Sequence, residues 1–345
     1  MKVLNVMTLA LAAFSGFAAA QDAPAAPATK LIVSVMNNKR WVAIPSLKAQ
    51  GKNVVFINPQ TTEPAAMPVR APYLIHTPKE LDDAFVDYRG GDLSAAMKLF
   101  EQVRGKYAEY RELDGNPSLR AAMAELDCAV RLQNWAHLAQ VGDAIAAKTY
   151  GDITARQIAT VQAARYVAQA MTGVADPTKA KGLYDAILKQ QSKYAALNNT
   201  GTVENIGLRP YSWYCYCLGR LAEAQIPEAQ LTGTITADAL PVANEAIDRY
   251  CQAAVALHGV APELAGDATM RALKLLHAMP GVKEYIKTAS AAGKMDAATW
   301  NKAPNDFKDA VAMAHLIKKV YAPEVKDSLV DSLATLYFAP EPKAE

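Results

Sequence analysis

The chain has 345 residues, of which 51% are hydrophobic and 20% are charged, and its formal net charge at pH 7 is +2. This balance argues against binding to nucleic acid, whose phosphates require a clustered excess of lysine and arginine. The length is enough for a large core and is typical of two domains or of an elongated array.

The first residues have the pattern of an export signal. An apolar run over 3–17 is followed by the small residues Ala18, Ala19 and Ala20, which a signal peptidase recognises, ahead of Gln21. The sequence therefore predicts a signal peptide over 1–20, cut after Ala20, and a periplasmic or secreted location. The run is too short to span a bilayer, so no stable membrane insertion is expected after signal cleavage.

Two segments with different compositions follow the predicted signal peptide. Residues 21–29 are rich in alanine and proline, which predicts a flexible lead-in. Over 30–76, short β-branched and aromatic runs alternate with turn residues, which predicts a small antiparallel β module. The expected strands are 31–35, 41–44 and 54–57, with 73–75 as an optional fourth. Asn37 and Asn38 favour a tight turn, so the first two strands are expected to pair directly.

From residue 77 the apolar period becomes helical. Thr77, Pro78 and Glu80 match a capping box with proline at the first helical position, which predicts a helix that begins here with Thr77 as its N-cap. Antiparallel helix pairs are expected over 77–199. Further pairs with a C-terminal cap and a short tail are expected over 200–345. The helices of this second region are predicted at about 208–225, 237–257, 262–279, 305–320 and 324–337.

A spacing of 42 residues recurs within the first helical region. Asp92, Asn134 and Asp176 form one column of residues that favour the N-cap of a helix, and each is expected to begin the second helix of a pair. The next columns hold the first helical residue, a core position three residues on, and a second core position four residues after that. These columns are Leu93, Trp135 and Pro177; Ala96, Leu138 and Ala180; and Phe100, Gly142 and Tyr184.

Tyr88, Gly91, Asp92, Ala96 and Phe100 together resemble the tetratricopeptide repeat (TPR), and Asp176, Ala180 and Tyr184 match its second half. The region over 30–190 is also similar to exported bacterial TPR-like proteins in which helix pairs follow an N-terminal β segment. The resemblance implies a mainly α fold: a TPR-like α-solenoid of antiparallel helix pairs, preceded by the β module. It also implies a groove lined by the first helices that binds a protein partner. The family's period is about 34 residues, so a spacing of 42 implies longer helices.

The densest aromatic segment lies on the helix predicted over 208–225. Tyr211, Trp213, Tyr214 and Tyr216 either form a partner-binding surface, for a protein, a glycan or a small molecule, or pack in the core. Tyr211 and Tyr214 share one face of the helix, which favours packing.

Cys251, on the following helix, is expected to lie opposite this segment. A disulfide from Cys217 to Cys251, or from Cys215 to Cys251, is therefore geometrically reasonable, with reduced buried thiols as the alternative. Cys128 has no evident partner in the sequence.

No motif of a known catalytic or cofactor site is present. The five histidines are scattered, and no phosphate-binding, serine-hydrolase or zinc-protease pattern occurs. The sequence therefore predicts a non-enzymatic interaction scaffold without a cofactor or metal. A glycan- or small-molecule-binding helical protein that uses 211–216 is the alternative. A hydrolase that uses paired acids such as Asp82 and Asp83, or Glu112 and Asp114, is a weaker one.

Overall fold

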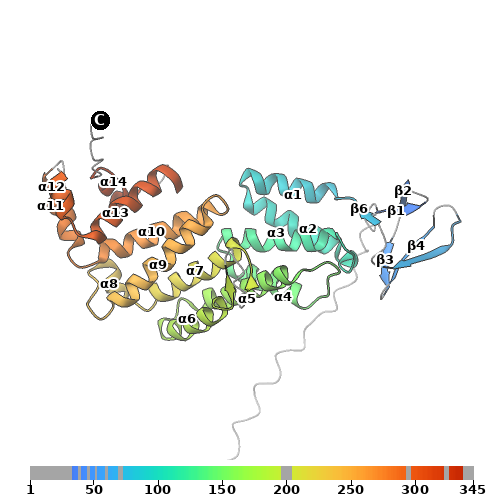
Figure 1. Cartoon of the computed structure of the whole chain (residues 1–345), viewed down its shortest axis with the longest axis horizontal. Coiled ribbons are helices and arrows are strands. Elements are labelled where there is room, and N and C mark those ends of the chain that lie inside the picture. Colours follow the sequence, from blue (N-terminus) through green and yellow to red (C-terminus); the bar gives the residue numbers. More distant parts are fainter. Residues whose placement is uncertain are drawn as a thin grey trace, which may run out of the picture.

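The computed structural model describes residues 33–37, 40–44, 47–50, 53–58, 61–68, 73–195, 204–292, 297–321 and 326–336. The predicted signal peptide and lead-in lie outside these residues. In the described part the chain is mainly helical, with small antiparallel sheets at its N-terminal end (Figure 1), as the sequence predicted. No helix there is both long and apolar enough to cross a membrane.

Within the described residues, the β strands form two antiparallel three-stranded sheets and one short parallel pair. The first sheet has the order β2-β1-β6 and the second the order β3-β4-β5. The strands are β1 (Val33–Asn37), β2 (Arg40–Ile44), β3 (Leu47–Gln50), β4 (Asn53–Ile57), β5 (Pro64–Pro68), β6 (Tyr73–Ile75) and the parallel pair β7 (Tyr194–Ala195) and β8 (Glu204–Asn205).

The predicted pairing of the first two strands is confirmed, with Asn37 opposite Arg40. The sequence analysis missed β3 and β5 because neither contains a β-branched residue. β5 has a proline at each end, which suits its place at an edge.

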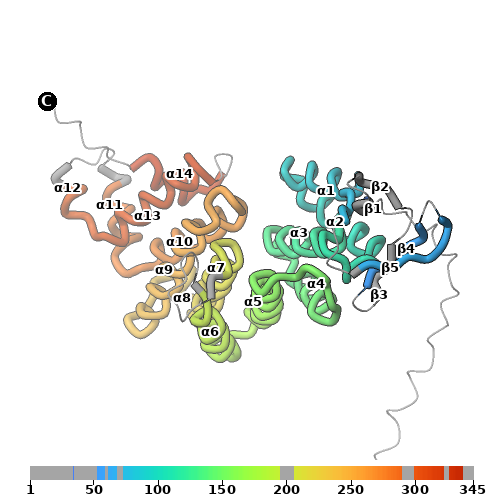
Figure 2. The backbone as a smooth tube through the Cα atoms, turned by 45° about the vertical axis from the view of Figure 1, so that its right-hand side comes forward, coloured from blue at the N-terminus to red at the C-terminus, as the bar shows by residue number. Residues whose placement is uncertain are grey.

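The helical region is a row of helices, and from α1 to α7 each packs on the next helix in the chain (Figure 1). The helices are α1 (Lys79–Gly90), α2 (Leu93–Lys106), α3 (Pro117–Arg131), α4 (Trp135–Ala146), α5 (Ala155–Gly173), α6 (Pro177–Gln191), α7 (Leu208–Glu223), α8 (Glu228–Thr232), α9 (Leu240–Leu257), α10 (Pro262–Ala278), α11 (Val282–Ala292), α12 (Ala297–Lys302), α13 (Asn305–Leu316) and α14 (Ser328–Ala334). Two short turns, the 3₁₀ turn η1 (Ala108–Tyr110) and the π turn η2 (Ile317–Tyr321), accompany them. The row bends, so that α5 and α6 lie low in Figure 2, with α1 and α14 high on opposite sides.

The predicted helices at 208, 262 and 305 begin at these residues, and the one predicted from 237 begins at Leu240. α8, α11 and α12 were not predicted. The last helix is shorter than the predicted 324–337, since α14 spans Ser328–Ala334.

The column at 42-residue spacing is confirmed as a column of caps. Asp92, Asn134 and Asp176 are the N-caps of α2, α4 and α6, and each side chain accepts a hydrogen bond from a backbone N–H of the first turn. The distances are 3.0 Å for Asp92, 3.1 Å for Asn134 and 3.1 Å for Asp176. The recurring residue therefore begins the second helix in each of three pairs.

The capping box predicted at Thr77 is wrong. The N-cap of α1 is Pro78, and no side chain caps the helix. Thr77 instead accepts a hydrogen bond from Arg120 at 3.2 Å, and Glu80 pairs with Lys106 at 2.5 Å. Both side chains have found partners on neighbouring helices, which the local pattern did not reveal.

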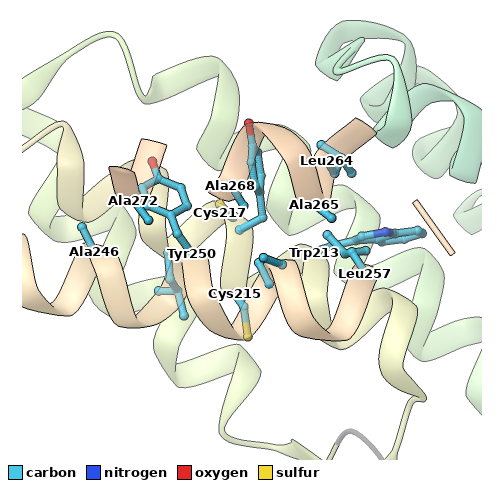
Figure 3. Packing of buried hydrophobic residues seen from close by; sticks show 14 of the residues in the cluster. Trp213, Cys215, Cys217, Ala246, Tyr250, Leu257, Leu264, Ala265, Ala268 and Ala272 are labelled. Carbon is cyan, nitrogen blue, oxygen red and sulfur yellow. The ribbon is translucent and has the colours of Figure 1, made fainter. Parts of the chain in front are cut away.

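The core is densest around α7, which is buried on every side over 212–219 because α5, α6 and α9 all pack against it. Figure 3 shows aromatic and sulfur side chains of α7 packed against small residues of α9 and α10. A Cβ added at Gly219 would lie 2.7 Å from ring carbons of Tyr250 on α9. Glycine at this position therefore sets how closely α7 and α9 approach.

Candidate functional site

The four aromatic residues proposed as a binding surface do not form one. Trp213, Tyr214 and Tyr216 are 2%, 0% and 1% exposed, and Tyr211 is half-buried; Figure 3 shows Trp213 among the packed core residues. α5, α6 and α9 pack against α7, which is buried over 212–219, so these rings lie in the core, as the alternative interpretation held. The glycan-binding prediction required an exposed aromatic strip and loses its basis here.

The disulfide that the sequence allowed is not formed, and the alternative of reduced thiols holds. All four cysteines are free thiols; Cys251 is half-buried and the other three are buried. The sulfur of Cys215 accepts a hydrogen bond from Gln191 of α6 at 3.1 Å and donates to Gln252 of α9 at 3.7 Å. Burial raises the pKa of Cys215 to about 11 and the pKa of Cys128 to about 12, so both remain unreactive thiols at neutral pH.

A different group of residues converges from α3, α7 and α10. On each helix they recur at multiples of three and four residues, so they form one stripe per helix and the stripes meet. We call this group the polar strip. It contains Asp127 and Arg131 of α3; Gln133 of the following turn; Arg209, Tyr216, Arg220 and Glu223 of α7; and Glu263, Asp267 and Arg271 of α10, with Tyr88 of α1 and Tyr250 of α9 at its borders.

One half of the strip fastens α3 to α1, α7 and α10, and we call it the clasp: Tyr88, Asp127, Arg131, Arg209 and Glu263. The Tyr88 hydroxyl donates to Asp127 at 2.6 Å, and Arg209 lies 3.3 Å from the other oxygen of that carboxylate. Arg131 donates to Glu263 from two nitrogens, at 2.6 and 3.0 Å. Its guanidinium also lies 5.2 Å from the ring centre of Tyr88.

Asp127 is the most deeply buried acid of the clasp. Loss of hydration raises its pKa, although Arg209 and the Tyr88 hydroxyl act in the opposite direction. These partners, together with Arg131, oppose the cost of burying the carboxylate, so the clasp is sensitive to their removal.

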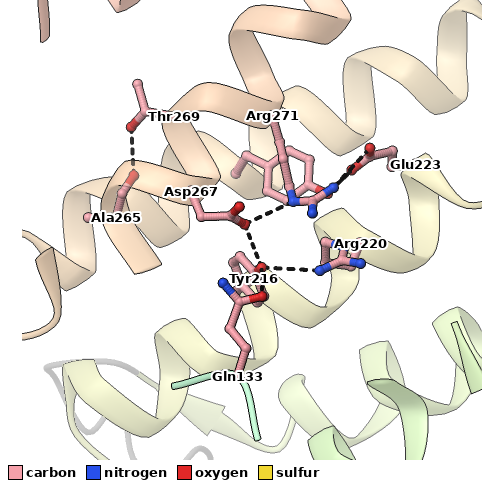
Figure 4. Close-up of polar contacts among 9 residues, drawn as sticks. Gln133, Tyr216, Arg220, Glu223, Ala265, Asp267, Thr269 and Arg271 are labelled. Atoms are coloured by element: carbon pink, nitrogen blue, oxygen red, sulfur yellow. Dashed lines mark hydrogen bonds and ion pairs between the residues drawn. The ribbon is translucent and has the colours of Figure 1, made fainter. Parts of the chain in front are cut away.

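The other half of the strip centres on Tyr216 (Figure 4). Its hydroxyl donates to Asp267 at 2.5 Å, lies 3.3 Å from the amide oxygen of Gln133, and accepts from Arg220 at 3.3 Å. Burial, followed by the charge of Asp267, raises the pKa of Tyr216 to about 12. The hydroxyl therefore stays protonated and acts as a hydrogen-bond donor.

Arg271 joins the two acids at this end of the strip. Its Nε donates to Asp267 at 2.8 Å, and its Nη1 lies 3.1 Å from both oxygens of Glu223 (Figure 4). Tyr250 donates its hydroxyl to Glu223 as well. The side chains of Arg271 and Asp267 remain 26% and 28% exposed, so this end of the strip is open to solvent.

The charges of the strip balance. Four arginines face four carboxylates, and each carboxylate has an arginine partner within 3.3 Å. The strip is therefore a neutral network of paired charges, and its partly exposed members include Arg209, Glu263, Asp267 and Arg271.

A second polar cluster lies on the other side of α3. Glu101, Glu125 and His137 come from α2, α3 and α4, and their ligand atoms lie within 4.8 Å of one another, as a bound metal would require. The sequence analysis missed this cluster because its members are 24 and 12 residues apart, outside the spacing of any local metal motif.

Comparison of the chain with protein-family models, curated proteins and solved structures finds no match. The TPR resemblance therefore rests on the columns of residues at 42-residue spacing in the chain itself.

The core positions of these columns pack inside the structure, where Ala96, Phe100, Leu138 and Ala180 are buried. Gly142 makes room for Arg165, Tyr184 donates to Glu245 at 2.5 Å, and Trp135 stacks on Tyr216 with ring centres 6.3 Å apart.

Proposed function

We propose that this chain is an exported, non-enzymatic scaffold, a TPR-like α-solenoid that binds a protein partner on the face of the polar strip. The observation that carries the proposal is the capping column Asp92, Asn134 and Asp176, which begins the second helix of three successive pairs. The export signal rests on the pattern over 1–20.

Helix pairs that pack in chain order are the basis for the solenoid. Each pair buries its apolar face on the next, and stacking of this kind produces an extended surface whose known use is binding. The polar strip supports a protein partner in particular. Its positive and negative side chains match a peptide, which carries both charges, better than they match a polyanion.

Two cations extend the strip beyond its balanced centre. Arg120 lies seven residues before Asp127 on the α3 stripe, and Lys274 lies seven residues after Asp267 on the α10 stripe; both are exposed. Arg120 contacts Thr77 and lies 5.9 Å from the ring centre of Phe85. Among the described residues neither cation has a carboxylate partner within 4 Å, so a partner segment that carries carboxylates would fit between them.

The test is a capture experiment from an envelope extract of the source cells. The wild-type chain is compared with the Arg120→Ala, Lys274→Ala double variant and with a control, Lys98→Ala, Lys189→Ala, on exposed positions of α2 and α6. All three are first shown to be folded by circular dichroism. We expect a reproducible partner that is retained by the control and lost, or weakened at least tenfold, in the strip variant. Equal capture by both variants would move the binding face away from the strip, and no reproducible partner would contradict the scaffold function.

A further inference from the structure

Glu125 is a fully buried carboxylate at the centre of a second polar cluster, distinct from the polar strip. Arg104 of α2 donates to both of its oxygens, at 2.6 and 3.1 Å. His137 of α4 approaches the same carboxylate from the opposite helix, with its Nε2 2.8 Å from Oε1. Glu101, one turn before Arg104 and exposed to solvent, brings a second carboxylate to this place.

The buried carboxylate of Glu125 is already paired. Arg104 balances its charge, as a buried carboxylate requires. Glu101 is exposed, so water hydrates its carboxylate and the side chain can turn toward a cation. A cation at this place would therefore lie between one carboxylate that is fixed by an arginine and one that can still move.

We propose that Glu101, Glu125 and His137 bind a divalent transition-metal ion of the zinc type. The ligands would be Nε2 of His137 and one oxygen of each carboxylate, with water in the open position. A set of one nitrogen and two oxygens suits zinc, whereas magnesium and calcium favour oxygen ligands alone.

The geometry requires two small movements. Ligands of a tetrahedral zinc ion lie about 3.4 Å apart, since each is about 2.1 Å from the metal. Nε2 of His137 and Oε1 of Glu125 are at hydrogen-bond distance, 2.8 Å, so they would move slightly apart to admit the ion, and all three ligand atoms lie within 4.8 Å of one another. Glu101 is on the surface, so a change of its side-chain rotamer can close the gap. Arg104 holds the carboxylate of Glu125 in place from behind, as the outer partners of metal ligands do.

The ion would tie together three consecutive helices, α2, α3 and α4. Since the site exists only in the folded chain, zinc is expected to raise the melting temperature, and the rise should grow with zinc concentration. Protons compete with a metal ion for its ligands, so affinity should fall as pH falls. This site is independent of the partner-binding face, so the metal proposal and the scaffold function can be tested separately.

The test is titration calorimetry with zinc chloride on the full chain, purified without a histidine tag and treated with a chelator. Manganese and magnesium chloride are titrated in parallel. We expect one zinc ion per chain, weaker binding of manganese, and no heat with magnesium. Glu101→Gln is the decisive variant because the side chain is exposed and the fold does not depend on it. It should weaken zinc binding at least tenfold and abolish the zinc-dependent rise in melting temperature.

Two further variants serve as controls. Glu109→Gln changes an exposed glutamate of η1 in the same way and should bind zinc as the wild type does. Cys251→Ser removes the half-buried thiol and should also leave the binding unchanged. Absence of zinc binding by the wild type, or equal zinc binding by the Glu101→Gln variant, would overturn the proposal.

Discussion

Gln133 has the same left-handed backbone conformation as Gly91, 42 residues earlier in the chain. Their φ angles are +53° and +87°, and each residue directly precedes the N-cap of a second helix. Glycine adopts this conformation without steric cost, whereas a residue with a side chain is disfavoured by about 1 kcal/mol. The repeat thus preserves the backbone path between its helices even where it has lost the glycine, and the side chain gained there reaches Tyr216 of the polar strip.

Replacing Gln133 separates these two effects. We expect the Gln133→Gly variant to be more stable than the Gln133→Ala variant by about 1 kcal/mol, because both lose the contact with Tyr216 and only glycine relieves the backbone. Gly91→Ala should lower stability by a similar amount. Urea denaturation followed by circular dichroism measures all three. Equal stability of the two Gln133 variants would show that the backbone there carries no strain.

Gly219 and Gly182 form a matched pair of helical glycines. Gly219→Ala places a methyl group 2.7 Å from the buried ring of Tyr250, and overpacking of this kind should destabilise the chain by about 1 to 3 kcal/mol. Gly182→Ala, on the exposed side of α6, meets no atom within 4 Å and should stabilise by about 0.5 to 1 kcal/mol. Thermal and urea denaturation of both variants check the opposite signs. If Gly219→Ala left the free energy of unfolding unchanged, α7 and α9 would be able to move apart without cost.

A double-mutant cycle measures how much the ion pair between Arg131 and Glu263 contributes to stability. With Arg131→Met and Glu263→Gln, the coupling energy is expected to be about 1 kcal/mol at low salt, since Glu263 is 43% exposed and the pair is screened by solvent. It should shrink in 1 M NaCl, where the screening length falls to about 3 Å. Small-angle scattering of the same variants shows whether α3 and α10 move apart. A coupling energy near zero at low salt would remove the clasp as a stabilising contact.

The raised pKa of Asp127 leads us to expect a specific dependence of stability on pH. Burial raises its folded-state pKa above the ordinary value of 3.8, so the folded chain holds this proton more tightly than the unfolded chain. Between these two pKa values stability should fall as pH rises, and this loss is complete above the folded-state value. Asp127→Asn removes the titration and can still accept from Tyr88.

The measurement is the free energy of unfolding of the wild type and of Asp127→Asn at steps from pH 3.5 upward. The wild type should lose stability relative to the variant as pH rises from about 4, by about 1.4 kcal/mol for each unit by which the two pKa values differ. Parallel pH profiles would show that Tyr88 and Arg209 fully compensate the burial of the carboxylate.

The local patterns of the sequence were sufficient for several elements. The β1–β2 pairing, the starts of the helices at 208, 262 and 305, and the caps Asp92, Asn134 and Asp176 follow from turn chemistry and from hydrogen bonds within one turn of a helix. Such interactions involve residues a few positions apart, so one chain segment contains all the information that fixes them.

Tertiary structure alone decided the sites. The sequence placed Trp213 and Tyr214 on a helix but did not show that three neighbouring helices cover them. It left open a disulfide from Cys217 or Cys215 to Cys251, whereas all three are free thiols. The partners within the polar strip are separated by up to 132 residues, as in the pair of Arg131 and Glu263. Burial and long-range pairing depend on how helices pack, and helical periodicity gives the face of each helix but not the neighbour that covers it.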